Sequence, residues 1–331
     1  MATQVASEEF MQLGFTDLYI RPAAEAQAGR RLIAKYLPTE RQRDIDVLMD
    51  FPDELFDDID RLHSMIGLAA KGREEFSVRY EPIRFRVTVI HDVIAGECYH
   101  LRRPKLEVPH LHELGIDTRR QSILEEVGKK RGLVLIVGGI SMGKTTTAGA
   151  LFKNWLTRYG GFAQIIQDVE ELTLSGVYGP NGHGLCTEEM VEGDAGWEGA
   201  LRRSMRTRPR YLGVNEIRSA EAACQVLRMS EAGQLVVAST HGGSIEEGLE
   251  SLYQLAARQM GELAKSVLAN GICGVVHQTL GRSLDMTMLF AGPSAGDPVR
   301  NTIRNGQFQS LRTIIQSQQA RMMAPAAAPA R

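Results

Sequence analysis

The sequence lacks the features of a membrane-spanning or disulfide-bonded protein. No apolar run approaches the roughly 20 residues that a membrane-spanning helix needs, and the N-terminus carries Glu8 and Glu9 without the apolar core of a signal peptide. The 4 cysteines of this 331-residue chain stand apart, with no Cys-x-x-Cys pair. Neither a zinc ribbon nor a disulfide framework is therefore indicated. We expect a cytoplasmic protein with free thiols.

An excess of charge is also absent. The chain has 38 Lys and Arg against 40 Asp and Glu, a formal net charge of −2, so no overall attraction to nucleic acid or anionic lipid is expected. Hydrophobic residues make up 43% and charged residues 24%, which is enough apolar material for a globular core. No internal repeat is present, and the length favours two domains.

The stretch most informative about function is residues 132–147. The unbroken apolar run from Leu133 to Val137 is typical of a strand buried on both faces. The run is followed by Gly138-x-x-x-x-Gly143-Lys144-Thr145, which fits the P-loop pattern at every fixed position. The two glycines allow successive N–H groups to point at phosphate oxygens, and a helix beginning there adds its positive N-terminal end. We expect a site for a nucleoside triphosphate.

Individual residues of this loop have separate expected roles. Lys144 would reach the β- and γ-phosphates, and the Thr145 hydroxyl would help to hold Mg²⁺. The predicted nucleotide-binding residues of the loop are Gly138, Gly139, Ser141, Gly143, Lys144, Thr145 and Thr146.

The N-terminal part of the chain, residues 1–105, is predicted to be a separate α/β domain. Helical spacing runs from Asp44 to Ala70, and strands are expected at 17–21, 76–80, 83–90 and 98–101. A hairpin is expected around Glu81-Pro82. A polar, proline-containing connection follows, and residues 106–118 are predicted to be a linker.

The remaining chain alternates strands and helices, which predicts a parallel sheet with crossover helices over residues 119–319. Strands are expected at 133–137, 163–167, 211–215, 234–239, 271–278 and 286–290. Helices are expected at 119–130, 145–159, 197–206, 220–232, 245–270 and 298–319. The glycine-rich segment 176–196 is predicted to be a long surface loop or hairpin, and the Ala- and Pro-rich tail 320–331 is predicted to be disordered.

Polar groups follow three strands of this second domain. They are Asp168 with Glu171, Glu216, and Thr240 with His241. Ligands of open α/β sheets bind beyond the carboxyl ends of the strands, and hydrolysis of Mg-ATP needs carboxylates to hold metal-bound water and to activate the attacking water. Each group alone would more often be a helix cap or a solvated turn, but their convergence favours a site. Glu216 is then the candidate that activates water, and His241 a candidate sensor of the γ-phosphate.

A dense run of arginines lies between two of these strands. Its members are Arg202, Arg203, Arg206, Arg208 and Arg210. Arg202 and Arg206 share one helix face. Three interpretations remain open: a solvated basic face, a phosphate contact across a subunit boundary, or a contact with nucleic acid. Only Tyr211, in a predicted buried strand, lies close to the run, so stacking of single-stranded bases has little support.

These motifs together resemble the type II/IV secretion ATPase family, especially its pilus-retraction (PilT-like) branch and its compact type IV secretion and conjugation ATPases. The resemblance extends from about residue 14 to residue 323. The motifs that carry it are Phe85-Arg-Val87, Ile166-Gln-Asp-Val-Glu-Glu171, Ala200-Leu-Arg-Arg-Ser-Met-Arg206, Asn215-Glu-Ile-Arg218, Ser239-Thr-His-Gly242 and Val299-Arg-Asn-Thr-Ile-Arg304.

The resemblance implies an N-terminal PAS-like domain, a RecA-like ATPase domain and a homohexameric ring with ATP between the domains. It implies inner-membrane partners from a type IV secretion, conjugation or type IV pilus machine, reached at the cytoplasmic face of the inner membrane. The slightly acidic net charge predicts no direct contact with nucleic acid. The catalytic residues would be Glu216, Glu171, His241 and Lys144, with Thr145 and Glu171 at the Mg²⁺. Nucleotide contacts would also come from Arg86, Arg102, Arg202, Arg206 and Arg218.

The chain departs from the family pattern at several positions. Gln167 stands where a glutamate is usual, Met142 replaces a hydroxyl-bearing residue of the P-loop, and Asn215 replaces glycine. The four-cysteine zinc insert of the extension and type II branch is absent, which argues against that branch. Two other functions therefore remain open. One is a RecA-like nucleic-acid motor. Its ATPase activity would be stimulated by DNA, and this stimulation would depend steeply on salt concentration. The other is a regulator that binds nucleotide with little turnover.

Overall fold

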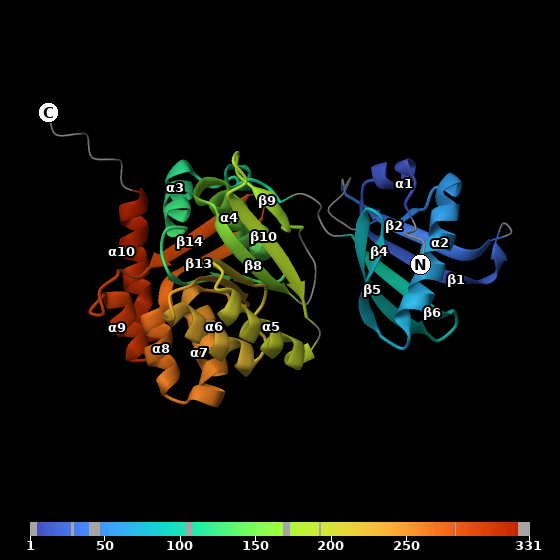
Figure 1. Ribbon diagram of the computed structural model, residues 1–331. Coiled ribbons are helices and arrows are strands. Elements are labelled where there is room, and N and C mark those ends of the chain that lie inside the picture. The colour runs from blue at the N-terminus through green and yellow to red at the C-terminus, as the bar shows by residue number, and fades with distance from the viewer. Residues whose placement is uncertain are drawn as a thin grey trace. The chain divides into compact units, whose positions relative to one another are not determined.

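The computed structural model describes residues 5–27, 30–39, 47–103, 108–167, 173–191, 193–281 and 283–323. These residues form two compact units, one N-terminal and one C-terminal (Figure 1). Each unit has its own sheet and its own hydrophobic core. Within the described residues, no helix combines the length and the apolarity that crossing a membrane requires.

The N-terminal unit is a six-stranded antiparallel sheet with the order β3-β2-β1-β6-β5-β4. Its elements are α1 (Glu8–Gln12), β1 (Phe15–Gln27), β2 (Arg30–Pro38), β3 (Met49–Asp50), a short 3₁₀ turn η1 (Asp53–Leu55), α2 (Phe56–Ala70), β4 (Glu75–Tyr80), β5 (Ile83–Asp92) and β6 (Gly96–Arg102). Buried and exposed residues alternate along β4, as expected for a strand with one face on a core. The predicted hairpin is confirmed, because β4 and β5 pair antiparallel on either side of Glu81-Pro82.

The helix predicted from Asp44 begins only at Phe56. Residues 44–46 lie outside the described residues, and Met49–Asp50 instead pair with β2 as a strand. Proline disfavours the helical conformation of the residue before it, so Pro52 keeps Phe51 out of a helix although the apolar spacing around it is helical.

The C-terminal unit is an eight-stranded sheet with the order β14-β13-β7-β12-β11-β8-β10-β9. Its strands are β7 (Gly132–Val137), β8 (Gly161–Gln167), β9 (Gly176–Tyr178), β10 (Gly184–Met190), β11 (Tyr211–Val214), β12 (Leu235–Thr240), β13 (Ile272–Leu280) and β14 (Leu284–Phe290). Its helices are η2 (Leu111–Leu114), α3 (Thr118–Val127), α4 (Lys144–Tyr159), α5 (Gly193–Thr207), α6 (Ala220–Glu231), α7 (Ile245–Met260), α8 (Leu263–Gly271), α9 (Pro298–Arg304), η3 (Phe308–Ser310) and α10 (Leu311–Met323).

The six central strands of this sheet run parallel, and the two edge strands β9 and β14 are antiparallel to their neighbours. Helices cover both faces. One core lies beneath α3 and α4, and the other lies beneath α5 to α9 (Figure 1). The strand β7, which leads into the P-loop, is therefore fully buried, as its unbroken apolar sequence predicts.

Two predicted helices are each divided by a glycine. The helix expected over 245–270 ends at Met260, and α8 begins at Leu263, because Gly261 adopts a φ of 57° between them. The helix expected over 298–319 is likewise divided around Gly306, whose φ is 70°. Its second part, α10, continues to Met323, into the predicted tail, and residues 324–331 lie outside the described residues.

The predicted surface loop or hairpin at 176–196 is a hairpin of β9 and β10. The strand β10 also joins the main sheet as the parallel neighbour of β8. The segment after the undescribed residues 104–107 packs against the same unit. Val108, Leu111 and Ile116 are buried in its core, and Lys153 Nζ on α4 donates to the carbonyl of Val108 at 2.6 Å.

Candidate nucleotide site

The P-loop connects β7 to α4 with its backbone shaped for an anion. Ser141 and Gly143 have φ angles of 60° and 77°, so the loop bends through the left-handed region at both positions. Gly143 is the N-cap of α4 and provides no side-chain hydrogen bond, and the first turn of α4 contains no acidic residue. The N–H groups of that turn are thus uncapped by any side chain, which is the arrangement that binds phosphate at a helix N-terminus.

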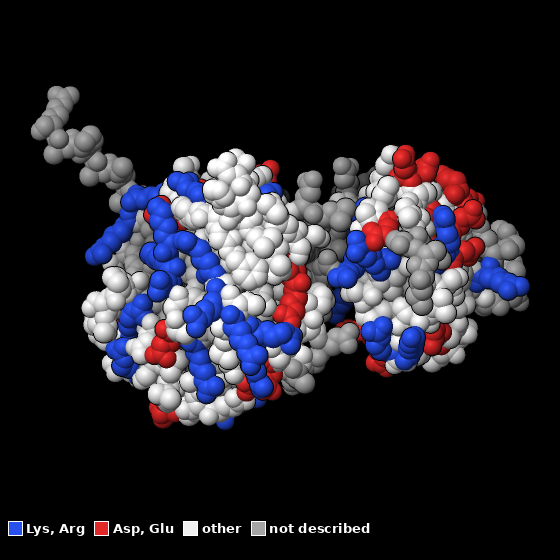
Figure 2. Space-filling model, in the orientation of Figure 1, with Lys and Arg blue, Asp and Glu red and all other residues white. Residues whose placement is uncertain are grey.

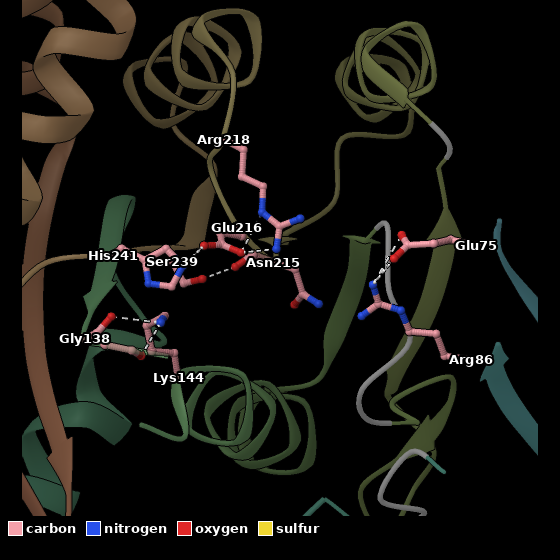
Figure 3. A network of polar contacts seen from close by, with 10 residues as sticks. Glu75, Arg86, Gly138, Lys144, Asn215, Glu216, Arg218, Ser239 and His241 are labelled. Carbon is pink, nitrogen blue, oxygen red and sulfur yellow. Dashed lines mark hydrogen bonds and ion pairs between the residues drawn. The ribbon is translucent and has the colours of Figure 1, made fainter. Parts of the chain in front are cut away.

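The Lys144 ammonium lies inside the loop (Figure 3). Its Nζ donates to the carbonyls of Gly138 at 2.9 Å and Gly139 at 2.8 Å. The cation is therefore held at the point where the loop and the helix N-terminus converge. Phosphate oxygens bound there would replace carbonyl oxygens as its acceptors.

Gln278, at the carboxyl end of β13, supports the loop from the neighbouring strand. Its side chain is 1% exposed, and its Nε2 donates to the carbonyl of Met142 at 2.5 Å. A Cβ added at Gly138 would lie 2.7 Å from the Gln278 carbonyl, so this position has room only for glycine. Sequence reasoning missed Gln278. This residue is the last one of the strand predicted at 271–278, so the rule that ligands bind beyond the carboxyl ends of the strands could have identified it.

The register of the sheet brings the other strand ends to the P-loop. Thr240 of β12 pairs with Val137 of β7, so His241 follows at the level where the P-loop begins. The next strand, β11, pairs with β12 and is followed by Asn215 and Glu216. Parallel strands end at one edge of a sheet, which is where ligands of such folds bind.

The Glu216 carboxylate is held between two basic side chains (Figure 3). One oxygen pairs with His241 Nε2, and the other accepts a hydrogen bond from Arg218 Nε at 2.8 Å. The Glu216 side chain is 15% exposed, whereas His241 and Arg218 are 51% and 63% exposed. The carboxylate is therefore largely shielded while its two partners face solvent.

A polar network anchors the segment before Glu216. Ser239 Oγ donates to the Asn215 carbonyl, and Asn215 Nδ2 donates to Gln167 Oε1 at 3.3 Å. Gln167 Nε2 in turn donates to Glu188 Oε1 at 3.1 Å. Ser239 and Glu188 are further residues that sequence reasoning did not identify. Their contribution depends on which strands are neighbours, and no local pattern encodes this.

The structure brings some predicted site residues together. Lys144 and the P-loop share one edge of the sheet with Glu216, His241 and Arg218. Thr145 and Thr146 follow in the first turn of α4. Asp168 and Glu171 lie outside the described residues, so their predicted roles stay predictions.

The remaining predicted arginines lie on other elements. Arg202, on α5, pairs with Glu198 one turn earlier on the same helix, and Arg206 is exposed in the last turn of α5. In the N-terminal unit, Arg86 of β5 is the register partner of Arg102 of β6, and it donates to Glu75 at 3.3 Å.

The sheet is parallel, its P-loop joins a buried strand to a helix, and acidic and basic side chains lie at the adjacent strand ends. These features define a RecA-like P-loop α/β unit. The model of the family described as "Type II/IV secretion system protein" matches residues 68–315. The chain belongs to this family.

Comparisons with individual proteins agree with this assignment. The chain is 25% identical over 244 residues to a "Twitching motility protein" of Neisseria gonorrhoeae, a match that covers 72% of this chain and 62% of that protein. It is 26% identical over 242 residues to the "Type IV pilus ATPase PilU" of Pseudomonas aeruginosa, covering 70% of this chain and 59% of PilU. The matches thus span less than two thirds of the length of these two relatives.

Solved structures share the fold. The crystal structure of "the Pilus Retraction Motor PilT and Bound ADP" matches with a TM-score of 0.70 and 21% identity, over 94% of this chain and 88% of that chain. The ATPase DotB of Legionella pneumophila matches with a TM-score of 0.70 and 15% identity, over 92% of this chain and 85% of that chain. The predicted architecture, an N-terminal domain followed by a RecA-like P-loop domain, is confirmed.

Proposed function

We propose that the protein is a Mg²⁺-dependent ATPase that works as a ring hexamer on a type IV secretion, conjugation or type IV pilus machine. The observation that carries this proposal is the Glu216 carboxylate, which is shielded and held by two basic groups at the sheet edge that the P-loop occupies. Relatives named as a pilus ATPase and a pilus retraction motor support the same activity. The machine's components would recruit the protein to the cytoplasmic face of the inner membrane.

The residues of the site divide the work between binding and chemistry. The uncapped N–H groups of the P-loop and the Lys144 ammonium bind the phosphates of ATP. Thr145, together with Glu171, would hold Mg²⁺, since hydroxyl and carboxylate oxygens are the ligands that this ion prefers. When bound, Mg²⁺ neutralises charge that develops on the phosphate oxygens.

Glu216 is the proposed general base. Its carboxylate accepts the proton of the attacking water. In the arrangement described here His241 and Arg218 occupy its two oxygens, so at least one of these contacts must open for water to approach. His241, once released, is free to contact the γ-phosphate.

The arginines are proposed to contact the nucleotide or a neighbouring subunit. Arg202, Arg206 and Arg218 are all exposed on the C-terminal unit. Arg202 also pairs with Glu198. Arg86 and Arg102 would serve from the N-terminal unit. A guanidinium suits this role because it binds phosphate oxygens in pairs.

The test is ATP turnover by the purified protein and by its Glu216→Gln variant. Loss of a positioned general base lowers turnover by roughly 10²- to 10⁴-fold, while ATP binding should persist because the P-loop is unchanged. The matched control is Glu262→Gln, which removes an exposed carboxylate paired with Lys265 away from the site and should leave turnover unchanged. Turnover that survives in Glu216→Gln would refute the assignment.

Two other outcomes would redirect the proposal. ATP binding without turnover in the unaltered protein would favour a nucleotide-binding regulator. Stimulation of turnover by DNA, falling steeply with added salt, would instead favour a nucleic-acid motor.

A further inference from the structure

The C-terminal unit has a large basic groove at the amino ends of its parallel strands, whereas the P-loop lies at their carboxyl ends. The groove has a volume of about 900 Å³. It is formed where β7, β11 and β12 begin, because Arg131, Arg210 and Gln234 each precede one of these strands. The P-loop lies where β7 ends, so a strand of six residues, roughly 20 Å, separates the groove from the nucleotide site.

Cations line the groove without any acidic side chain among them. They are Lys129, Lys130, Arg131, Arg208, Arg210 and Arg228. Figure 2 shows lysine and arginine side chains gathered over the face of this unit that bears α3 and α6, with few acidic side chains between them.

Half of these cations form no ion pair with a carboxylate, although the charge of Arg228 acts on Glu221 from farther away. Lys129 pairs with Glu126 at 2.8 Å, and Lys130 and Arg210 lie over aromatic rings. In the part of the chain that the structure describes, Arg131, Arg208 and Arg228 have no carboxylate within ion-pair distance. Three unpaired guanidinium groups around one hollow create a positive field that favours an anionic ligand.

Arg208 is presented by a strained backbone. It follows the last residue of α5 with a φ of 47°, and its N–H closes the helix onto the Ser204 carbonyl at 3.0 Å. Glycine is the usual residue at this left-handed position after a helix, and a residue with a Cβ is held there at a cost. Lys71, which follows α2, has the same left-handed conformation with a φ of 43°, so this conformation supports a function for Arg208 only together with the position of its side chain in the groove.

The groove also has an exposed apolar side chain at its edge, because Met205 is 49% exposed. Pro209, Met229 and Leu235 lie buried in the wall behind the lining cations. The lining holds no aromatic residue on which bases could stack.

We propose that this groove is a docking site for an acidic segment of a partner protein, one that carries apolar side chains among its carboxylates. Arg131, Arg208 and Arg228 would bind the carboxylates, and the exposed Met205 side chain would contact the apolar side chains. This site is separate from the nucleotide site, and its test does not depend on ATP turnover.

The experiment measures binding of a fluorescein-labelled peptide to the full-length protein by anisotropy. The probe alternates glutamate with leucine over about 12 residues, a length whose extended span of roughly 40 Å exceeds the groove, and the matched peptide has glutamine in place of glutamate. The glutamate peptide should bind and the glutamine peptide should not. Each exposed ion pair contributes up to about fivefold in affinity, so Arg131→Gln/Arg228→Gln should weaken binding by roughly five- to twentyfold.

Arg208→Gly separates binding from folding. It removes the charge and relieves the strained backbone, so it should weaken peptide binding by about two- to fivefold without lowering the thermal unfolding midpoint. The matched control is Arg258→Gln/Arg321→Gln, which removes two exposed arginines outside the groove and should change binding less than twofold. All three variants should keep the ATP turnover of the unaltered protein.

Several results would overturn the proposal. Peptide binding that is unaffected by the groove variants, or equally reduced by the control, would place the peptide elsewhere. Tighter binding of duplex DNA or of phosphatidylserine vesicles, lost in the same groove variants, would replace the acidic segment by another ligand. Self-association that needs Arg131 and Arg228 would assign the groove to a second copy of this chain.

Discussion

Substituting Gln278 by methionine should separate the stability of the C-terminal unit from its affinity for nucleotide. Gln278 donates to the P-loop carbonyl of Met142 at 2.5 Å. Its other amide atom, Oε1, is buried without a hydrogen-bond partner among the described residues. The same side chain thus forms one stabilising hydrogen bond and buries one acceptor without a partner, which is destabilising. Methionine is unbranched and of similar length, so it keeps the volume and removes both features.

The two effects on stability oppose each other. Loss of the hydrogen bond to Met142 costs about 0.5–1.5 kcal/mol, and removal of the unsatisfied acceptor returns about 1–3 kcal/mol. The Met142 carbonyl lies on a partly exposed loop, where water can replace the lost donor. We therefore expect the free energy of unfolding to stay level or to rise by about 1 kcal/mol.

Nucleotide affinity should move in the other direction. Without its tether to β13, the P-loop samples conformations that do not bind phosphate, and ordering it again on binding costs about the energy of the lost bond. About 1 kcal/mol corresponds to roughly fivefold weaker binding of ADP or ATP. Calorimetric titration with ADP and chemical unfolding of the same samples would measure both quantities.

Gln164→Met is the matched control. Gln164 is also buried, but its amide is satisfied on both sides, donating to Glu189 at 2.8 Å and accepting from Thr207 at 2.8 Å. This substitution should lower the free energy of unfolding by about 1–3 kcal/mol and leave ADP affinity unchanged. The reasoning is refuted if Gln278→Met leaves ADP affinity unchanged, or if it destabilises the protein as much as Gln164→Met does.

Two further predictions concern stability. Burial alone would raise the pKa of Asp17, but hydrogen bonds from His100 and Thr16 and the charge of Arg102 lower it overall. A carboxyl group whose pKa is lower in the folded state stabilises the fold at pH values above its unfolded-state pKa. This stabilisation is lost as the pH falls through the folded-state pKa. The difference in the free energy of unfolding between the unaltered protein and Asp17→Asn should therefore shrink below about pH 4, as measured by chemical unfolding at a series of pH values. Arg208→Gly should raise the free energy of unfolding by about 0.5 kcal/mol, because relief of a left-handed residue outweighs the added freedom of the unfolded chain; an unfolding midpoint that falls would contradict this.

Local patterns predicted much of this fold and site. The P-loop strand, loop and helix follow from residues adjacent in sequence, and the parallel order of the central strands places Glu216 and His241 at the same edge as Lys144. The apolar run of β7 predicts burial on both faces, which the structure confirms. In each of these cases the physical cause lies within a few residues of its effect, or in the rule that parallel strands end together.

The parts that could not be predicted depend on distant or weak signals. Gln278 bonds to Met142 across 136 positions of the chain, and no local spacing encodes this contact. Gly261 and Gly306 end helices whose apolar periodicity continues past them, since a glycine inside a helical pattern is often tolerated. The basic groove draws its lining from separate segments around residues 130, 209 and 230, so only the arginine run was visible in the sequence.

Gln167 is a departure from the family pattern that could either weaken the site or be matched to a different set of hydrogen-bond partners. The residue stands where a glutamate is usual, and the sequence alone suggested a lost carboxylate. In the structure Gln167 is buried and donates to Glu188 Oε1 at 3.1 Å. The other Glu188 oxygen accepts from the backbone N–H groups of Leu174 and Ser175 at 2.9 and 2.7 Å. A second departure, Asn215, donates to the same Gln167 side chain, so the two unusual residues satisfy each other.

Restoring the usual residue by Gln167→Glu should therefore harm the protein. It would place two carboxylates at hydrogen-bond distance in a partly buried position. Protonating one of them at neutral pH costs on the order of 4 kcal/mol against an ordinary pKa of about 4.3. The destabilisation should shrink toward pH 5, where that proton is cheaper to bind. Gln167→Met, which loses the hydrogen bonds without adding charge, should destabilise by an amount that does not vary over this pH range. If Gln167→Glu is as stable as the unaltered protein at pH 7 and turns over ATP faster, Gln167 is a weakened carboxylate position and the mutual arrangement with Asn215 and Glu188 is incidental.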